Sequence, residues 1–374
     1  MSCRFLYLVG QLHTGGLERQ LYYLLQAMDR ERYSPAVAVW KYQDKDIHVP
    51  LIRALGVPLH SFTPGFSRTA RLAAFRSLVK HLEPEVVHSY SFYTNFAAYY
   101  GARGTDAVAV GSIRNDFILD KKWTGLLLGR LSARWPAQQI CNSSRAAENA
   151  RQSGGFFVPG RPFVVRNGLD LKRFQSSPVM THKTTRILAV GYLLPAKRWD
   201  RLLLAASKLK RRGLDCIIRI AGDGPLEASL GQEARNLGVT DCVRFIGHTD
   251  DIPALLSDSA FLVHTSDNEG CPNAVMEAMA CGRAVVAMDA GDIPHLVEDG
   301  KTGFVVRRGD IETLVDRMVT LVADRDLCRR MGEAARAKAE REFGLNRLVE
   351  ETLTAYRAAG WKDSSQCDSD FAHQ

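Results

Sequence analysis

The sequence predicts an α/β protein made of two domains, each with a parallel sheet. Its 374 residues exceed the roughly 250–300 residues at which a single hydrophobic core stops growing. Short apolar runs alternate with longer stretches of helical periodicity, which is the pattern of parallel strands joined by helices. The pattern is interrupted by the polar segment 175–185 and then starts again, which indicates a linker between two halves.

In the first half, the apolar run 4–9 ends at Gly10 and predicts a buried strand. Leucines and a methionine recur at helical spacing over 17–29. Further strands are expected at 35–40, 85–88, 107–110 and 163–165, with helices at 69–82 and 143–153 among others.

In the second half, the same alternation resumes after residue 185. Strands are expected at 186–190, 216–221, 243–246, 261–264 and 284–288. Helices are expected at 198–212, 226–237 and 274–281, followed by a long, charge-rich helical region at 310–359. Two such halves would place a ligand crevice between them, at the carboxyl ends of both sheets.

Composition excludes several classes of protein. No apolar stretch reaches the roughly 18 residues of a membrane span, and the first residues lack the layout of a signal peptide. The eight cysteines form no CxxC pair, which favours reduced thiols in the cytoplasm over a disulfide scaffold or a zinc site. We therefore expect a cytoplasmic protein without a structural metal.

The net charge of +8 is unevenly distributed. Residues 1–180 hold 23 Lys and Arg against 12 Asp and Glu, whereas residues 181–374 hold 26 against 29. Only the first half is therefore expected to meet an anionic partner, such as nucleic acid, an anionic bilayer or a phosphate-bearing substrate. We expect no nucleic acid, because neither an RNP-like aromatic strand nor a zinc-finger pattern is present.

The strongest motif is a pair of glutamates eight residues apart, Glu269 and Glu277. A loop that contains Gly270 and a proline separates them and leads into a helix near Asn273. Backbone N–H groups in such a loop and at a helix N-terminus bind anions without a metal. A diphosphate could bind there, with Glu277 accepting from ribose hydroxyls and Glu269 meeting a sugar. Spacing alone leaves the alternative equally open: Glu269 caps a loop and Glu277 is a solvated helix residue.

Two weaker motifs are compatible with phosphate binding. Gly15 and Gly16 precede a helix and would let the backbone approach a phosphate, although the full GxGxxG pattern is missing and a plain strand–helix turn is the alternative. Lys197 follows a strand and a proline loop, where it could neutralise a phosphate as a point charge. The alternative for Lys197 is an ordinary solvated lysine.

As an ordered set, these motifs resemble the retaining glycosyltransferases of family 4. The matching segments span about residues 5–358: Gly15 to Glu18, Val165 to Asp170 with Phe174, Gly191 to Lys197, Ala221 to Pro225, Val243 to Gly247, Glu269 to Gly282, and Asp299 to Phe304. The resemblance implies the GT-B fold, in which two Rossmann-like doubly wound domains face each other across a cleft.

The domain bounds expected from this resemblance are 1–174 for the acceptor side and 175–342 for the nucleotide-sugar side. A helix at 343–360 is expected to return to the first domain. The tail 361–374 lacks periodicity and is expected to be disordered.

The resemblance also implies roles for individual residues. Glu269 matches the glutamate that contacts the donor sugar hydroxyls near the reacting carbon, Glu277 matches the one that binds the ribose, and Lys197 matches a diphosphate contact. The other implied donor contacts are glycines, helix N-terminal amides and a strand end near the base: Gly15, Gly16, Gly270, Asn273, Ala274, Phe245, Ile246 and Gly247.

The sequence departs from the family pattern at two positions. Tyr192 stands where the family often carries an arginine, so phosphate neutralisation is expected to depend on Lys197 and Arg198. Arg114 takes the place of a family histidine on the catalytic side; an arginine can stabilise the leaving phosphate or a donor hydroxyl but cannot act as a base. The alternative for Arg114 is a structural ion pair with Asp116 or Asp120.

The expected reaction is transfer of a sugar from a UDP- or GDP-linked donor to a hydroxyl of a lipid-linked or polysaccharide acceptor, with retention and without a metal. In the family the leaving phosphate is thought to accept the acceptor's proton, so no protein nucleophile is needed. Two alternatives remain open: a nucleotide-sugar epimerase of the same architecture, and a non-catalytic nucleotide-sugar binding protein.

Basic amphipathic segments near 68–80 and 121–135 suit an anionic bilayer. They suggest a peripheral location on the inner face of the plasma membrane. The alternative is that these are ordinary buried helices with solvated basic edges.

Overall fold

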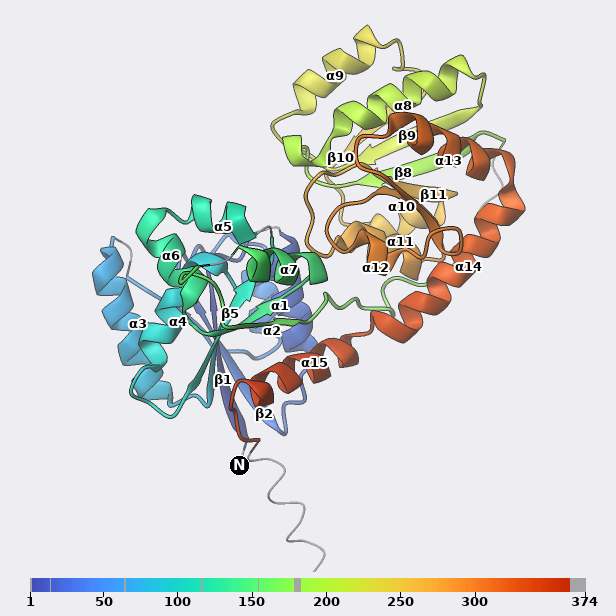
Figure 1. The fold of residues 1–374 in the computed structure, drawn as a ribbon. Coiled ribbons are helices and arrows are strands. Elements are labelled where there is room, and N and C mark those ends of the chain that lie inside the picture. The colour runs from blue at the N-terminus through green and yellow to red at the C-terminus, as the bar shows by residue number, and fades with distance from the viewer. Residues whose placement is uncertain are drawn as a thin grey trace, which may run out of the picture. The chain divides into compact units, whose positions relative to one another are not determined.

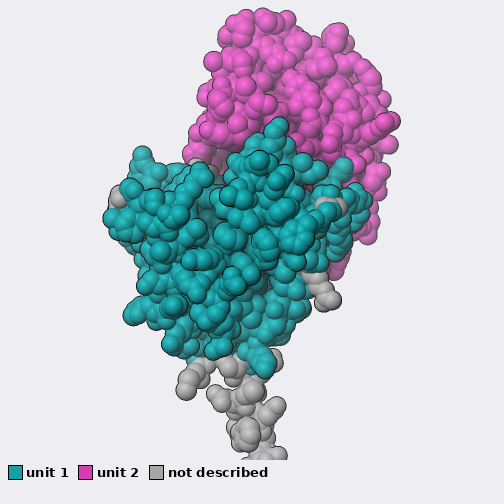
Figure 2. Space-filling view, turned by 60° about the vertical axis from the view of Figure 1, so that its left-hand side comes forward, with its two compact units in different colours: residues 1–168, 345–374 teal, residues 169–344 magenta. Residues whose placement is uncertain are grey.

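The chain folds into two compact units, which Figure 2 shows in different colours. The computed structural model describes residues 2–13, 15–63, 65–115, 117–153, 155–177 and 183–363. Unit 1 comprises residues 1–168 and 345–374, and unit 2 comprises residues 169–344. The chain therefore enters unit 2 once and returns to unit 1 for its last helix.

Unit 1 is a parallel sheet with helices on both faces (Figure 1). Its strands are β1 (Cys3–Val9), β2 (Tyr33–Val39), β3 (Leu59–Ser61), β4 (Val86–Ser89), β5 (Val108–Ile113), β6 (Gln138–Cys141) and β7 (Arg161–Val164). Its helices are α1 (Gly16–Ala27), α2 (His48–Ala54), α3 (Arg68–Leu82), the 3₁₀ turn η1 (Phe92–Thr94), α4 (Asn95–Ala102), α5 (Phe117–Trp123), α6 (Leu126–Arg134), α7 (Ser144–Gln152) and α15 (Leu345–Ala358).

The strand order in unit 1 is β3-β2-β1-β4-β5-β6-β7. Side chains alternate across β1, because successive residues of a strand point to opposite faces. Leu6 and Leu8 pack with Phe75 of α3 and the alanines of α4. Phe5 points the other way, and its ring lies 5.5 Å from the ring of Tyr356 in α15.

Helix α15 completes unit 1 from the far end of the chain. The Tyr356 hydroxyl and Nδ1 of His88, both buried, are 2.7 Å apart. Trp361 is also buried, and its indole N–H donates to Glu85 at 2.9 Å. The expectation of a disordered tail is therefore wrong for residues 361–363, because Trp361 packs its ring against Phe5; residues 364–374 lie outside the described part.

Unit 2 is a second parallel sheet with covering helices (Figure 1). Its strands are β8 (Thr185–Val190), β9 (Cys216–Ala221), β10 (Val243–Gly247), β11 (Phe261–His264), β12 (Ala284–Met288) and β13 (Gly303–Val306). Its helices are the 3₁₀ turn η2 (Pro195–Lys197), α8 (Trp199–Arg211), α9 (Glu227–Asn236), α10 (Ile252–Ser257), α11 (Asn273–Ala280), α12 (Ile293–Leu296), α13 (Ile311–Ala323) and α14 (Arg325–Glu342).

The strand order in unit 2 is β10-β9-β8-β11-β12-β13. β12 is buried along its whole length, as expected for a parallel strand covered on both faces. Alternate residues of all six strands join α8, α9, α13 and α14 in one hydrophobic core. Both units therefore have the doubly wound order that reverses direction beside the first strand.

The units divide between Gly168 and Leu169, six residues before the predicted division at Phe174. The side-chain amide of the buried Gln20 holds Gly168 in unit 1, accepting from its N–H at 2.8 Å and donating to its carbonyl at 2.9 Å. The next residue already belongs to unit 2, since the Leu169 N–H donates to Phe343 at 2.7 Å.

The polar segment 175–185 is not the point of division. Its described start belongs to unit 2, where the guanidinium of the buried Arg283 donates to the backbone carbonyl and the hydroxyl of Ser177. Residues 178–182 lie outside the described part.

Candidate active site

Two loops meet in unit 2 where the order of the strands reverses. β8 and β11 are neighbours, and ligands of such sheets bind outside the carboxyl ends of the strands at this switch point. The loop after β8 leads through η2 to Lys197. The loop after β11 is tied to it, because the Asp267 N–H donates to Ala196 at 2.9 Å and the Thr265 hydroxyl donates to the Lys197 carbonyl at 3.0 Å.

These loops bring three of the unit's ionisable side chains together. Nζ of Lys197 lies 2.6 Å from Oε1 of Glu269, and Nε2 of His264, at the end of β11, lies 2.9 Å from the same oxygen. The Glu269 side chain is only 11% exposed. Burial raises the pKa of Glu269, but Lys197 and His264 outweigh it and hold that pKa well below its usual range.

Because Glu269 is ionised, its oxygens can only accept, and Nε2 of His264 is the donor. Within the described residues both contacts fall on Oε1. The second oxygen, Oε2, is therefore left to accept a hydroxyl of a bound molecule. The structure thus brings Lys197 and Glu269 together, and their contacts with a donor stay predictions.

Arg198 differs from Lys197 in the number of carboxylates that bind it. Among the described residues Lys197 pairs with one carboxylate, Glu269, whereas Arg198 pairs with two. Its guanidinium donates to both oxygens of Asp200, at 3.0 and 2.7 Å, and to Asp267 at 2.8 Å. Asp267 also binds Arg201 at 2.5 Å. Arg198 is therefore the centre of a structural ion-pair cluster. Of the two cations Lys197 and Arg198, Lys197 is the better placed to neutralise a phosphate.

Glu277 lies one turn inside α11 and is 2% exposed. It is therefore not the solvated helix residue of the alternative interpretation. The first residues of the helix, Asn273 and Ala274, are half-buried, and no side chain caps the helix at Pro272. An anion at this N-terminus would meet the positive end of the helix dipole.

Gly270 is held close to a second loop of the same unit. The Asp292 N–H donates to the Gly270 carbonyl at 2.9 Å. Gly291 has φ +55°, and a Cβ there would lie 2.4 Å from the carbonyl oxygens of Glu269 and Gly270. Only a glycine permits this approach. Gly291 therefore helps to position the backbone of Glu269 and Gly270.

The predicted base-side residues lie at the carboxyl end of β10. The Gly222 N–H donates to the Gly247 carbonyl at 2.8 Å, and a Cβ on Gly222 would lie 2.0 Å from the Gly191 carbonyl. The loops after β8, β9 and β10 therefore gather at one edge. Ile246 is 39% exposed, and Phe245 is half-buried.

In unit 1, Gly15 and Gly16 begin α1. Gly15 is extended at φ −165°, so a left-handed conformation is not the reason for the glycine. A Cβ there would lie 2.2 Å from a carboxylate oxygen of Glu18. Glu18 is itself buried, and burial raises its pKa. The contact of these glycines with a diphosphate stays a prediction.

Arg114 lies at the carboxyl end of β5 and is 8% exposed. Its guanidinium carbon lies 3.9 Å from the centre of the Tyr90 ring. Asp120 binds Asn115 at 3.3 Å, and Asp116 lies outside the described residues. Within the described part of the chain no carboxylate forms an ion pair with Arg114. Because a buried cation is costly without a partner, this position suits an anionic ligand.

If Arg114 has the role that the resemblance implies, Arg114→Met should lower the rate of sugar transfer by about 10²-fold, because it removes a cation from the place where the leaving phosphate would gain charge. Arg114→Lys should restore little, since an ammonium lacks the planar face that stacks on Tyr90. Steady-state kinetics measures this. Arg76→Met is the matched control, because Arg76 also stacks on a tyrosine of unit 1, Tyr100; equal losses in both variants would contradict the role of Arg114.

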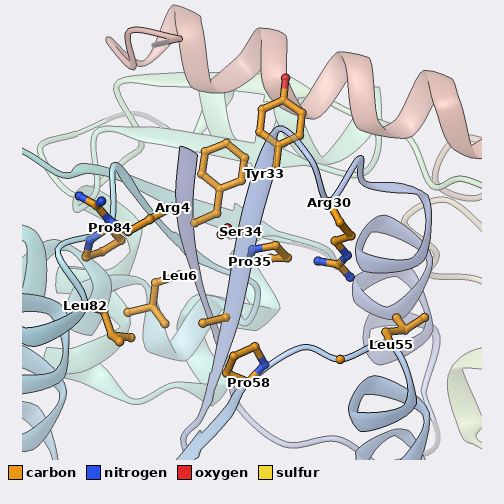
Figure 3. A pocket seen from close by; sticks show the side chains of 13 residues that line it. Arg4, Leu6, Arg30, Tyr33, Ser34, Pro35, Leu55, Pro58, Leu82 and Pro84 are labelled. Atoms are coloured by element: carbon orange, nitrogen blue, oxygen red, sulfur yellow. The ribbon is translucent and has the colours of Figure 1, made fainter. Parts of the chain in front are cut away.

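A cavity of about 400 Å³ lies elsewhere in unit 1. It is lined by residues at the amino ends of β1 and β2, the opposite edge of the sheet from Arg114. Figure 3 shows Arg4 and Arg30 on either side of these strands. None of the predicted site residues lines this cavity.

The sequence interpretation missed three residues of these sites. His264 binds Glu269, Asp267 orients the loop, and Tyr90 stacks on Arg114. The spacing His-x₄-Glu after a strand was the one available signal for His264. Within the described residues no group of three or more His, Cys, Asp and Glu side chains could hold a metal.

The chain matches two family models. Residues 172–338 match the family described as "Glycosyl transferases group 1", and residues 14–173 match "Glycosyltransferase Family 4". With the two parallel sheets, these matches define a glycosyltransferase of the GT-B class. The chain belongs to family 4 of these glycosyltransferases, with its second unit in group 1.

Curated relatives match over part of their length. The chain is 28% identical over 204 residues to an N-acetyl-alpha-D-glucosaminyl L-malate synthase of Bacillus anthracis, covering 54% of this chain and 51% of the relative. It is 31% identical over 187 residues to a GDP-mannose-dependent phosphatidylinositol monomannoside mannosyltransferase of Mycobacterium tuberculosis, covering 45% and 49%. The chain thus spans about half the length of the curated relatives it matches.

One solved structure with the same fold is Anabaena HepE in complex with UDP-glucose. It superimposes with a TM-score of 0.81 at 20% identity and covers 95% of this chain and 99% of that one. At this identity the likeness shows the fold alone.

Proposed function

We propose that the protein transfers a sugar from a UDP- or GDP-linked donor to a hydroxyl of a lipid-linked or polysaccharide acceptor, with retention and without a metal. The observation that carries the proposal is the carboxylate of Glu269, held on one oxygen by Lys197 and His264 next to the start of α11. This arrangement combines a group for sugar hydroxyls with a cation and a helix N-terminus for a diphosphate.

In the proposed step the bond between the anomeric carbon and the phosphate oxygen breaks, and its electron pair goes to the diphosphate. The acceptor oxygen bonds to the same face of that carbon, and its proton goes to the leaving phosphate. Lys197 and the start of α11 stabilise the charge that develops on the phosphate. Glu269, ionised, accepts from a sugar hydroxyl and stabilises the positive charge on the ring.

The named relatives support the substrate classes. One is named for GDP-mannose and a phosphatidylinositol mannoside, and HepE was solved with UDP-glucose. We further propose that the protein acts in the cytoplasm at the inner face of the plasma membrane, with the basic unit 1 toward the anionic lipids. No helix in the described part of the chain is long and apolar enough to cross a membrane.

The first test is thermal unfolding of the purified protein with UDP-, GDP- and ADP-sugars in EDTA. A ligand at 100 times its Kd stabilises by about 2.7 kcal/mol, which raises Tm by a few degrees for domains of this size. We expect one base class to stabilise, and the shift to disappear in Glu277→Ala.

Glu227→Ala is the matched control, because Glu227 lies exposed in the first turn of another helix of unit 2, α9. A shift that requires a divalent cation would contradict metal independence. Product analysis then separates transfer from epimerisation, since an epimerase changes the donor without any acceptor.

A further inference from the structure

The most exposed apolar side chains in the described part of the chain come from neighbouring elements of unit 1. Among the described residues, the five most exposed large apolar side chains are Leu126, Leu127, Trp123, Phe156 and Ile118, from 76% down to 59%. Four of them belong to α5 and α6, and Phe156 follows α7. A cluster of this kind on a folded surface marks a place of interaction.

The exposure follows from how α6 packs. Its small residues Gly129, Ser132 and Ala133 face inward and are buried. A Cβ on Gly129 would lie 2.1 Å from the Lys121 carbonyl, so α6 approaches the backbone of α5 closely. The leucines at the start of α6 consequently point outward, although side chains of this size usually fill the core.

Aromatic and cationic side chains brace the surface. The Lys121 ammonium donates to the Phe157 carbonyl at 3.0 Å. The Arg134 guanidinium lies over the rings of Trp135 and Phe156, at 5.5 and 5.4 Å from their centres. These contacts hold the loop after α7 against α5 and α6, so the backbone that carries the exposed apolar side chains is fixed in place.

The charge of this surface has one sign. Residues 117–137 contain four basic residues, Lys121, Lys122, Arg130 and Arg134, and a single acidic one, Asp120. Asp120 is buried, whereas Lys122 and Arg130 are exposed. The outer face therefore combines apolar groups with positive charge, which complements the interface of an anionic bilayer.

The other basic segment considered above, 68–80, has no such face. Phe75 and Val79 are fully buried in the core. Arg76 donates to the Tyr100 carbonyl and lies over its ring. This segment is an ordinary core helix with a basic edge, which is the alternative that the sequence left open.

We propose that the α5–α6 surface, formed by Ile118, Trp123, Leu126, Leu127 and Phe156, docks the protein on an anionic lipid bilayer. The indole and the leucines enter the interface, and Lys122 and Arg130 contact lipid phosphates. α5 begins three residues after Arg114, so docking would bring lipid-borne acceptors to the edge of the sheet that carries Arg114. The docking deepens the proposed membrane location, and that last consequence also rests on the proposed transfer reaction. Vesicle binding can therefore fail while the transfer reaction stands.

Co-sedimentation of the full chain with vesicles tests the proposal without donor or acceptor. We expect binding to vesicles of phosphatidylcholine with phosphatidylglycerol, weaker binding to phosphatidylcholine alone, and a further loss as salt rises. Replacing Leu126 and Leu127 together by serine should lower the partition coefficient at least tenfold. Lys122→Ala and Arg130→Ala should each lower it about fivefold on anionic vesicles.

The matched control replaces two exposed leucines of other helices, Leu51→Ser in α2 and Leu204→Ser in α8, and should partition like the parent protein. Tm and the nucleotide-induced shift report that each variant is folded and binds donor. Binding that ignores anionic lipid, or equal losses in the control, would overturn the proposal. A concentration-dependent dimer, lost with the serine pair and without vesicle binding, would assign the surface to a second copy instead.

Discussion

Lys197→Ala should lower kcat/KM about 10²–10³-fold. Lys197 contributes a cation beside the start of α11, where the leaving diphosphate gains charge, and removing one such group has an effect of this size. The loss should appear largely in kcat, because the charge is greater in the transition state than in the bound donor. Steady-state kinetics with the donor identified by thermal shift measures this.

The matched control for this variant is Lys208→Ala. Lys208 also pairs with a carboxylate in unit 2, Glu312 of α13, but it lies near the last turn of α8, whereas Lys197 precedes the first turn. Exposed pairs of this kind contribute about 0–1 kcal/mol, so its kinetics should match those of the parent. A loss below about tenfold in Lys197→Ala would remove Lys197 from the site.

Glu269→Gln should lower the transfer rate by about 10²-fold or more. The glutamine keeps the size of the side chain and one acceptor for His264 and Lys197, but it removes the negative charge that faces the sugar ring. Glu298→Gln is the control, because Glu298 is another carboxylate of unit 2 bound by a lysine, with Nζ of Lys338 at 3.2 Å. Retained activity in Glu269→Gln would exclude a charge-dependent role.

The same variant should change how the stability of the protein depends on pH. The pKa of Glu269 is lower in the folded protein than its ordinary value of 4.5. Its ionisation therefore stabilises the fold above the unfolded pKa, and this contribution is lost as the pH falls below about 4.5. Chemical denaturation from pH 7 to 3 should show a shallower decline in Glu269→Gln than in the parent.

Three strands of unit 2 were the best predicted elements. The structure places β9, β11 and β12 at the predicted residues 216–221, 261–264 and 284–288. β11 and β12 are buried along their whole length, because both faces of a parallel sheet are covered. β9 is apolar except for Arg219, and its buried and half-buried residues alternate over its first four positions. The strands β3, β6 and β13 were not predicted. β3 and β6 contain polar residues and β13 begins at a glycine that follows a turn, so none of these short segments shows a clear apolar run.

Site residues could be predicted only where they belong to a motif that is local in the sequence. The glutamate pair and the glycines of the loops form local motifs that a sequence displays. His264 reaches Glu269 through the turn that follows β11, and Tyr90 reaches Arg114 from a neighbouring strand. Such contacts depend on the path of the loops and on strand order, which spacing does not contain.

The division of the chain was displaced for a similar reason. The polar segment 175–185 has the composition of a linker, yet its start is bound by Arg283, which lies 106 residues after Ser177. The true crossing at Gly168 is set by the amide of Gln20, which lies 148 residues earlier. A hydrogen bond between residues so far apart in the sequence does not change the local composition, so composition cannot predict where the units divide.

Unit 1 is assembled from both ends of the chain, and this constrains how the protein emerges from the ribosome. Unit 2 is continuous and can fold as soon as residue 344 has left the exit tunnel. Unit 1 must wait for α15, which ends about 190 residues after the chain first leaves it. At a synthesis rate of about 5–20 residues per second, Tyr356 is made roughly 10–40 seconds after residue 168. During this time it cannot pack on Phe5 of β1 or bind His88 of β4. Of the two units, the one that is synthesised first is thus the one that is completed last, and until then Phe5 and His88 lack their contacts with Tyr356.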